Sequence, residues 1–440
     1  MYWAIFLDKH LMKNIKNITY MLVVQISNYA FPLITIPIVA RIFGPEKIGL
    51  INYISAIVIY FSMLVNYSFN YTGVRRLTRD KNNKNSIFST VFFTQLFLFL
   101  LSLSFFTACL FFIRDLRDNI LLSAVTFLSC VSSLFTQNWF LQANNDFKFI
   151  AIISFFMKLI TFIMIMVLIH DSNDLIFYAL LLNGVNLIFS IITFIITIFK
   201  YKISIYFPGA KVCLKYLKED KYLFFSSVVT TLYTTTGIIL LGFLSNKIEV
   251  GIYSSAQRLI DVFKNIFLMP ISQIIFPILS AKFGKDKDIG LDSIRKIMPL
   301  FILATISFFI FINIFRWQFV SILFGPQFYP MVDILSILSF GLFCVFYGVL
   351  IGGQVMLNLC MDKAFLYIQI VISVISLIFN SVFIPSGGGV ATAYIWAFSE
   401  FIITTYQILY LKYYNVNVIS FNMLTLSKIK ESYKYVINKG

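Results

Sequence analysis

Three charged residues stand three positions apart inside a long apolar stretch of the chain: Arg258, Asp261 and Lys264. Steps of three keep side chains on one broad face of a helix, where Asp261 can pair with either cation. A charge at the centre of a membrane-spanning helix costs about 2.5–3.5 kcal/mol on insertion scales, so each such residue needs a partner, a wet cavity or a function. The triplet therefore indicates a cationic, water-filled cavity that attracts an anionic substrate. The alternative interpretation is a structural ion cluster.

Two further cations extend this predicted substrate-binding set. Lys158 lies within the apolar stretch 149–169, and Arg41 lies at the end of the apolar stretch 18–40. We predict that both residues line the cationic cavity together with Arg258 and Lys264. Alternatively, Lys158 extends its ammonium group to the membrane interface while its methylene chain stays in lipid.

One acidic residue, Glu400, lies about ten residues into the apolar stretch 390–411. A carboxylate at membrane depth can bind and release a proton during transport. We therefore predict that Asp261 and Glu400 couple an ion to transport or act as charge partners. Pairing of Glu400 with a lysine on another helix explains the sequence equally well.

The first apolar stretch carries a polar stripe made of Gln25, Asn28 and Pro32, followed by Pro37. Proline removes a backbone hydrogen bond and bends a helix. A bent helix with a polar stripe predicts a gating element, and the alternative is an ordinary packed helix that tolerates its prolines.

The composition shows which elements must position these residues. Of 440 residues, 59% are hydrophobic and 12% are charged, and the mean hydropathy is +0.87. A soluble domain is usually about 25% charged, so the chain is predicted to be an all-α integral membrane protein. Because a spanning helix needs about 20 apolar residues, twelve spans are predicted. They are 18–40, 48–69, 87–113, 119–137, 149–169, 175–199, 223–245, 249–280, 297–315, 331–357, 365–385 and 390–411.

The distribution of basic residues predicts the topology. Of the 35 Lys and Arg residues, 26 fall in the termini and even-numbered connections and six in the odd-numbered ones. Cytoplasmic loops carry the excess of Lys and Arg, so both termini are predicted to be cytoplasmic. The net charge of +16 is therefore attributed to topology and not to nucleic-acid binding. The two histidines and five cysteines lack metal-ligand spacing, so no metal site and no catalytic Cys/His pair is expected.

The order of the segments predicts two six-helix bundles. Ile48 to Tyr53 opens the second span, and the similar segment Val250 to Ser255 opens the eighth. Transporters are commonly built from such repeats. The expected organisation is a cytoplasmic N-terminus (1–17), an N-terminal bundle (18–199), a basic cytoplasmic linker (200–222), a C-terminal bundle (223–411) and a cytoplasmic tail (412–440).

Several motifs resemble those of a known family. They are Pro37 to Gly49 (PIVARIFGPEKIG), Asn66 to Asn70 (NYSFN) followed by Arg75-Arg76, Asn138 to Gln142 (NWFLQ), Val250 to Ala256 (VGIYSSA) and Pro270 to Gln273 (PISQ). These segments look like those of O-antigen and polysaccharide flippases of the Wzx type, which belong to the same superfamily as the multidrug and toxin extrusion transporters. Arg41 falls within the first of these motifs, and Arg258 follows VGIYSSA by two residues in the same matching stretch. Lys158, Lys264 and Glu400 are predicted from physical arguments alone.

The resemblance implies export of undecaprenyl-pyrophosphate-linked oligosaccharide repeat units by alternating access across the bacterial inner membrane. It implies two bundles around a cationic lumen, no cofactor, and coupling to a proton or sodium gradient as an option. The expected partners are the lipid-linked oligosaccharide, the phospholipid bilayer, and the polymerase and chain-length proteins of the same pathway.

Two other functions compete with this one. A drug or cation antiporter of the same fold predicts a cavity dominated by carboxylates, but here Lys158, Arg258 and Lys264 outnumber Asp261 and Glu400. A membrane enzyme, such as an oligosaccharide polymerase or ligase, would need large external loops with catalytic groups. The short outer loops offer only the pair His170-Asp171, so we do not expect an enzyme.

Overall fold

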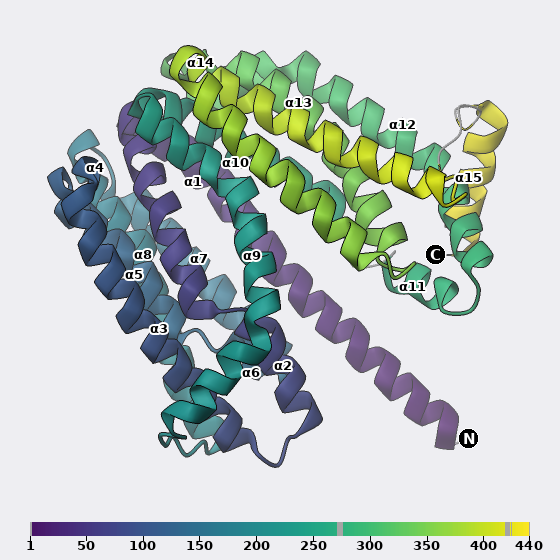
Figure 1. Ribbon diagram of the computed structural model, residues 1–440, viewed down its shortest axis with the longest axis horizontal. Helices are drawn as coiled ribbons and strands as arrows, with labels where there is room; N and C mark the ends of the chain where they lie inside the picture. The colour runs from purple at the N-terminus through teal and green to yellow at the C-terminus, as the bar shows by residue number, and fades with distance from the viewer. Residues whose placement is uncertain (1, 271–275, 419–422, 424, 440) are drawn as a thin grey trace. The chain divides into compact units, whose positions relative to one another are not determined.

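The computed structural model describes residues 2–270, 276–418, 423 and 425–439. The described part of the chain contains helices and turns and no strand. It divides into two compact units, Met1–Thr231 and Leu232–Gly440. Each unit is an α-helical bundle, as the composition predicts (Figure 1).

The first unit contains the helices up to the middle of α9. They are α1 (Tyr2–Asn66), α2 (Phe69–Arg79), α3 (Lys84–Phe112), α4 (Arg114–Asp118), α5 (Ile120–Phe135), α6 (Asn138–Ala143), α7 (Phe147–Leu168), the 3-10 turn η1 (Ser172–Asp174), α8 (Leu175–Tyr201) and the start of α9 (Ala210–Leu244). Inside this unit α1 packs against α3, α5 and α7, and α5 packs against α8.

The second unit contains the rest of α9 and the helices that follow. They are α10 (Lys247–Pro270), α11 (Phe276–Phe283), α12 (Lys287–Phe319), the π-helix η3 (Val320–Phe324), the 3-10 turn η4 (Pro326–Phe328), α13 (Met331–Gly348), the π-helix η5 (Val349–Met356), α14 (Asp362–Tyr413) and α15 (Leu426–Lys439). In this unit α13 packs against α10, α12 and α14, and α15 packs against α12.

Two helices are long enough for two membrane crossings each. α1 has 65 residues and is interrupted at Gly44 (φ 72°), and α14 has 52 residues and is interrupted at Gly388 (φ 51°). A positive φ is readily adopted by glycine, so these positions end one span and begin the next. By length and composition, eight helices of the described residues are apolar enough to cross a membrane, or nine if the bent α9 is included. Counting α1 and α14 twice and adding the more polar α10 gives the twelve predicted spans.

The predicted spans agree with these helices, except that some helices continue beyond the predicted ends of the spans. Residues 210–222, within the expected linker 200–222, form the first turns of α9, where Cys213 and Asp220, seven residues apart, lie on one buried side. Residues 287–296 similarly form the start of α12, where Asp286 caps the helix through the backbone N–H groups of Asp288 and Ile289. Of the eighth predicted span, residues 271–275 lie outside the described residues.

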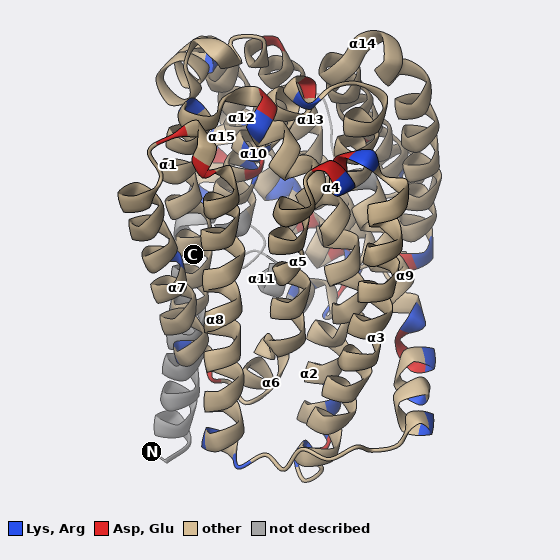
Figure 2. Cartoon of the chain, turned by 90° about the vertical axis from the view of Figure 1, so that its left-hand side faces the viewer, with Lys and Arg blue, Asp and Glu red and all other residues tan. Residues whose placement is uncertain are grey.

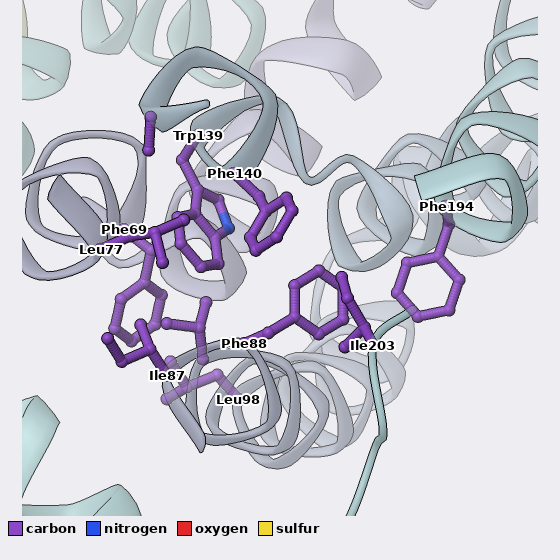
Figure 3. Close-up of a cluster of buried hydrophobic side chains, with 11 residues drawn as sticks. Phe69, Leu77, Ile87, Phe88, Leu98, Trp139, Phe140, Phe194 and Ile203 are labelled. Carbon is purple, nitrogen blue, oxygen red and sulfur yellow. The ribbon is translucent and has the colours of Figure 1, made fainter. Parts of the chain in front are cut away.

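The core of the first unit gathers around a buried tryptophan (Figure 3). Trp139 of α6 is 1% exposed, and its ring lies near Phe88 of α3, which in turn stacks edge-on against Phe140. The indole Nε1–H donates to Gln137, whose amide donates to Gln95 at 2.8 Å. The motif NWFLQ thus forms a short buried helix whose side chains share one core cluster with those of α2, α3 and α8.

Charges are concentrated away from the middle of the long helices (Figure 2). The ribbons of α5 and α8 are free of Lys, Arg, Asp and Glu except for Lys200 at the end of α8. This pattern is expected of helices that cross hydrocarbon, where an unpaired charge is costly. It makes the few charges within α7, α10 and α14 stand out.

Candidate functional site

The charged triplet lies on one side of α10 in the second unit. The opposite side of α10 carries the buried residues Leu259 and Ile260 and packs against α13 and α14. Arg258 is exposed, and the side chains of Asp261 and Lys264 are 41% and 30% exposed. The structure therefore places all three predicted residues on the side of α10 that the helices of its own unit leave uncovered.

Within the triplet, Asp261 pairs with Lys264. The Lys264 Nζ donates to Asp261 Oδ1 at 2.5 Å, three residues along the helix. The formal charge of this side of α10, with Arg258 included, is plus one. The pair is partly exposed, so this net-positive face can attract an anion such as a phosphate.

Glu400 lies apart from this exposed face. It is 9% exposed, on the side of α14 that packs against α13. One turn away, Thr404 donates to the carbonyl oxygen of Cys344 on α13 at 2.9 Å. Glu400 is thus a carboxylate within the α13–α14 packing, and its role in ion coupling stays a prediction.

In the first unit the polar stripe of α1 and Lys158 lie on two helices that pack together. Phe31 of α1 contacts Phe155 and Phe162 of α7, with ring centroids 5.8 and 5.6 Å apart. Lys158 is half-buried and lies one turn from both of these α7 residues, so its side chain emerges near the contact with α1. Gln25, Asn28 and Pro32 are half-buried on α1.

The non-helical residue of α1 lies between the first two predicted spans. The helix continues through Pro32 and Pro37, and its non-helical residue is Gly44. Near Pro32, the hydroxyl of Thr35 donates to the carbonyl oxygen of Phe31 at 3.1 Å. Arg41 is exposed one turn before Gly44 and therefore lies at the end of a span. The gating role predicted for Gln25, Asn28, Pro32 and Pro37 stays a prediction.

A small cavity of about 70 Å³ lies in the first unit, and Lys158 is not among the residues that line it. Its polar lining residues are Thr136, Asn138, Ser154, Asn186, Ser190 and Thr193. None of them was predicted as a site residue, although Asn138 begins the motif NWFLQ. The sequence does mark these residues, because amides and hydroxyls inside apolar helices seldom lie against lipid.

Two polar contacts that were not predicted connect residues near the ends of spans that are far apart in the sequence. In the first unit, Arg76 donates to both carboxylate oxygens of Asp220, at 2.6 and 2.8 Å, although Arg75-Arg76 was singled out only as a motif. In the second unit, the Gly389 N–H donates to Glu249 Oε2 at 2.8 Å. Neither contact is visible as a local pattern, because the partners lie more than 130 residues apart. No group of three or more His, Cys, Asp or Glu in the described ranges could hold a metal.

The fold has counterparts among solved structures. It resembles the lipid II flippase MurJ in an inward closed conformation, with a TM-score of 0.71 and 16% identity over 97% of this chain and 91% of that one. It also resembles an inward-facing multidrug resistance MATE family transporter of the MOP superfamily, with a TM-score of 0.60 and 13% identity over 90% of this chain and 94% of that one. The chain is therefore a multi-pass, all-α membrane protein with the fold of these transporters.

The sequence comparisons assign the family. The family described as "Polysaccharide biosynthesis protein" matches residues 15–283, and the chain belongs to it. A protein of Escherichia coli K12 that is named for O-antigen transport is 26% identical over 82% of this chain and 88% of its own length. The capsular polysaccharide biosynthesis protein CapF of Staphylococcus aureus is 24% identical over 78% of this chain and 85% of its own length. The family predicted from the motifs is thereby confirmed.

Proposed function

We propose that the protein is a flippase that moves undecaprenyl-pyrophosphate-linked oligosaccharide repeat units across the bacterial inner membrane. The observation that carries this proposal is the exposed, net-positive side of α10, formed by Arg258, Asp261 and Lys264 within a membrane-spanning helix. Membership of the polysaccharide biosynthesis family and the name of the E. coli relative support the choice of cargo.

The chemistry of the cargo fits this surface. A pyrophosphate group carries negative charge that lipid does not solvate, whereas the oligosaccharide needs water or hydroxyl partners. Guanidinium and ammonium groups on α10 would replace the hydration of the phosphates by charge-assisted hydrogen bonds. The polyprenyl tail would remain in the bilayer while the head group crosses, so the hydrocarbon part of the cargo never meets the polar surface.

Transport in this proposal proceeds by alternating access of the two units, with both termini in the cytoplasm. Lys158 and Arg41 would add positive charge from the first unit, and Glu400 would couple the cycle to protons or sodium. The polymerase and chain-length proteins of the same pathway would receive the exported repeat units. No step needs a covalent bond to be made or broken, so we propose a transporter and not an enzyme.

A reconstituted assay tests the proposal. The full-length protein is placed in liposomes that contain an undecaprenyl-pyrophosphate-linked oligosaccharide, and outward movement is read from the sugar that becomes accessible to an added glycosidase. We expect transport by the wild type, and at least a tenfold loss in the double variant Arg258→Ala/Lys264→Ala. Lys218→Ala, which removes an exposed lysine of α9, is the matched control and should transport normally.

Two results would contradict the proposal. The first is a wild-type protein that folds in liposomes and moves no lipid-linked sugar. The second is full transport by the double α10 variant, which would remove the cationic surface from the mechanism. Export of organic cations by the same liposomes would instead favour the drug antiporter of the same fold.

A further inference from the structure

A groove in the second unit lies apart from the charged side of α10. It has a volume of about 380 Å³ and runs between the two spans of α14, one before and one after Gly388. Its walls include Lys363, Tyr367, Val371, Ile372, Tyr406 and Tyr410. Apart from the lysine and three phenolic hydroxyls, the side chains that line it are apolar, and its volume falls within the range of small-molecule pockets.

The surface around the groove has the character of a lipid-facing surface. Along the first span of α14, the exposed apolar residues beyond the groove include Val374, Leu377 and Ile378, of which Val374 and Ile378 are more than half exposed. No charged residue occurs between Lys363 and Glu400. A continuous apolar patch on a membrane-spanning helix is solvated by lipid chains, so the groove opens to the bilayer.

The length of the groove matches one leaflet. From Lys363 to Ile372 the helix advances nine residues, or about 13 Å at the rise of an α-helix. Half of a hydrocarbon core of about 30 Å is of the same length. A chain lying in this groove therefore reaches from the interface to about the middle of the bilayer.

The mouth of the groove has the groups of a membrane interface. Lys363 lies in the first turn of α14, after the loop 357–361 that is predicted to be cytoplasmic. Tyr410 lies in the last turns of the same helix, beside Tyr414, with ring centroids 5.0 Å apart. Tyrosine is enriched at the level of lipid head groups, and lysine near the cytoplasmic surface attracts anionic lipids. Asp362 adjoins Lys363 in sequence, and its side chain is not part of the lining.

We propose that this groove is a binding site for an anionic glycerophospholipid of the surrounding bilayer. One acyl chain would lie along Ile372 and Val371, and the phosphate would lie at Lys363 and the Tyr410 hydroxyl. The groove is as deep as one leaflet, so it accommodates the acyl chain of a phospholipid but not the whole of a much longer polyprenyl tail. The lysine favours an anionic head group over a zwitterionic one. The lining of this groove includes none of Arg258, Asp261, Lys264 and Glu400, so variants of the groove leave the proposed transport residues unchanged.

Native mass spectrometry of the full-length protein in detergent tests the site. Phosphatidylglycerol and phosphatidylethanolamine are titrated at equal concentrations, and the bound lipid is counted at each step. We expect the wild type to bind one phosphatidylglycerol in preference to phosphatidylethanolamine. Lys363→Ala should lower the affinity for phosphatidylglycerol about fivefold, and Val371→Trp, which fills the groove, should remove the binding of both lipids at this site. Lys430→Ala, an exposed lysine of α15 in the same unit, is the matched control.

Four outcomes would overturn the proposal. Equal binding of both lipids by the wild type would remove the role of charge, and unchanged binding by the Val371→Trp variant would place the lipid elsewhere. An equal loss in the Lys363→Ala and Lys430→Ala variants would indicate diffuse attraction to surface lysines. Displacement of phosphatidylglycerol by an equimolar amount of undecaprenyl phosphate would assign the groove to the polyprenyl chain instead. None of these outcomes depends on transport, so the proposed function is tested separately.

Discussion

Arg76 and Asp220 form a two-pronged ion pair between α2 and α9, with N–O distances of 2.6 and 2.8 Å. The side chain of Asp220 is fully buried, and that of Arg76 is 15% exposed. The same guanidinium donates to Glu219 at 2.9 Å and lies 3.9 Å from the centre of the Tyr216 ring. This pair fixes the first turns of α9 to the first unit, 144 residues away from Arg76 in sequence.

Removal of Arg76 should therefore destabilise the first unit. Loss of one partner leaves the Asp220 carboxylate buried without its counter-charge, which costs about 3 kcal/mol. Arg76→Lys should cost less than Arg76→Ala, because an ammonium group keeps the charge but loses the two-pronged geometry and the contact with Tyr216. The midpoints of thermal unfolding in detergent rank the variants by stability. The control is Arg79→Ala, which changes an exposed residue of the same helix. Equal midpoints for Arg76→Ala and Arg79→Ala would show that the pair is not stabilising.

The close packing of α2 on Trp139 gives a second prediction. A Cβ at Gly73 would lie 2.6 Å from Cε3 of Trp139, whereas at Gly184 the nearest side-chain atom would be 3.6 Å away. Gly73→Ala should therefore cost about 1–3 kcal/mol through overpacking. Gly184→Ala should be neutral or slightly stabilising, because alanine favours a helix over glycine. Trp fluorescence during denaturant titration compares the two variants, and a Gly73→Ala variant as stable as Gly184→Ala would contradict the packing described here.

A contact at the start of the second span of each unit gives a third prediction. Lys47 donates to the carbonyl oxygen of Ser172 at 2.6 Å in the first unit, and Glu249 accepts from the Gly389 N–H at 2.8 Å in the second. In both units, the start of the second span thus holds the turn between the fifth and sixth spans. Glu249→Ala should destabilise by about 1.5–3 kcal/mol and Glu249→Gln by less, because a hydrogen bond to a charged acceptor is the stronger one.

The control for Glu249 is Glu46→Ala, which removes an exposed acid at the corresponding helix start of the first unit. Its midpoint of thermal unfolding should stay within the error of the wild type. If Glu249→Ala unfolds at the same temperature as Glu46→Ala, the contact with Gly389 does not stabilise the second unit.

The sequence predicted the spans well because hydrocarbon imposes a simple rule on length and polarity. The segments 119–137 and 175–199 correspond to α5 and α8 to within two residues at each end. The break between spans at Gly388 was also visible, because Ser386 and three consecutive glycines interrupt the apolar pattern there. Helical extensions beyond the membrane, such as 210–222, were missed, since a polar helix at an interface and a polar linker have the same composition.

The candidate site was predictable only in part. The spacing of Arg258, Asp261 and Lys264 correctly predicted a shared helix face and a pair between Asp261 and one cation. The choice of Lys264 as that partner depends on rotamers, which spacing does not specify. Contacts such as Arg76 with Asp220 depend on tertiary packing and have no local signal.

Removal of single charges from the α10 triplet gives the last prediction. Asp261 offsets one of two cations, so the face carries plus one in the wild type, zero in Lys264→Ala, and plus one again in Asp261→Asn/Lys264→Ala. If the face attracts the pyrophosphate through its net charge, transport at low substrate should fall about tenfold in Lys264→Ala, equivalent to about 1.4 kcal/mol, and should recover in the double variant. A structural salt bridge predicts the opposite, because the double variant lacks both partners and would stay impaired. The liposome assay at limiting lipid-linked oligosaccharide distinguishes the two mechanisms, and a double variant no better than Lys264→Ala would exclude attraction by net charge.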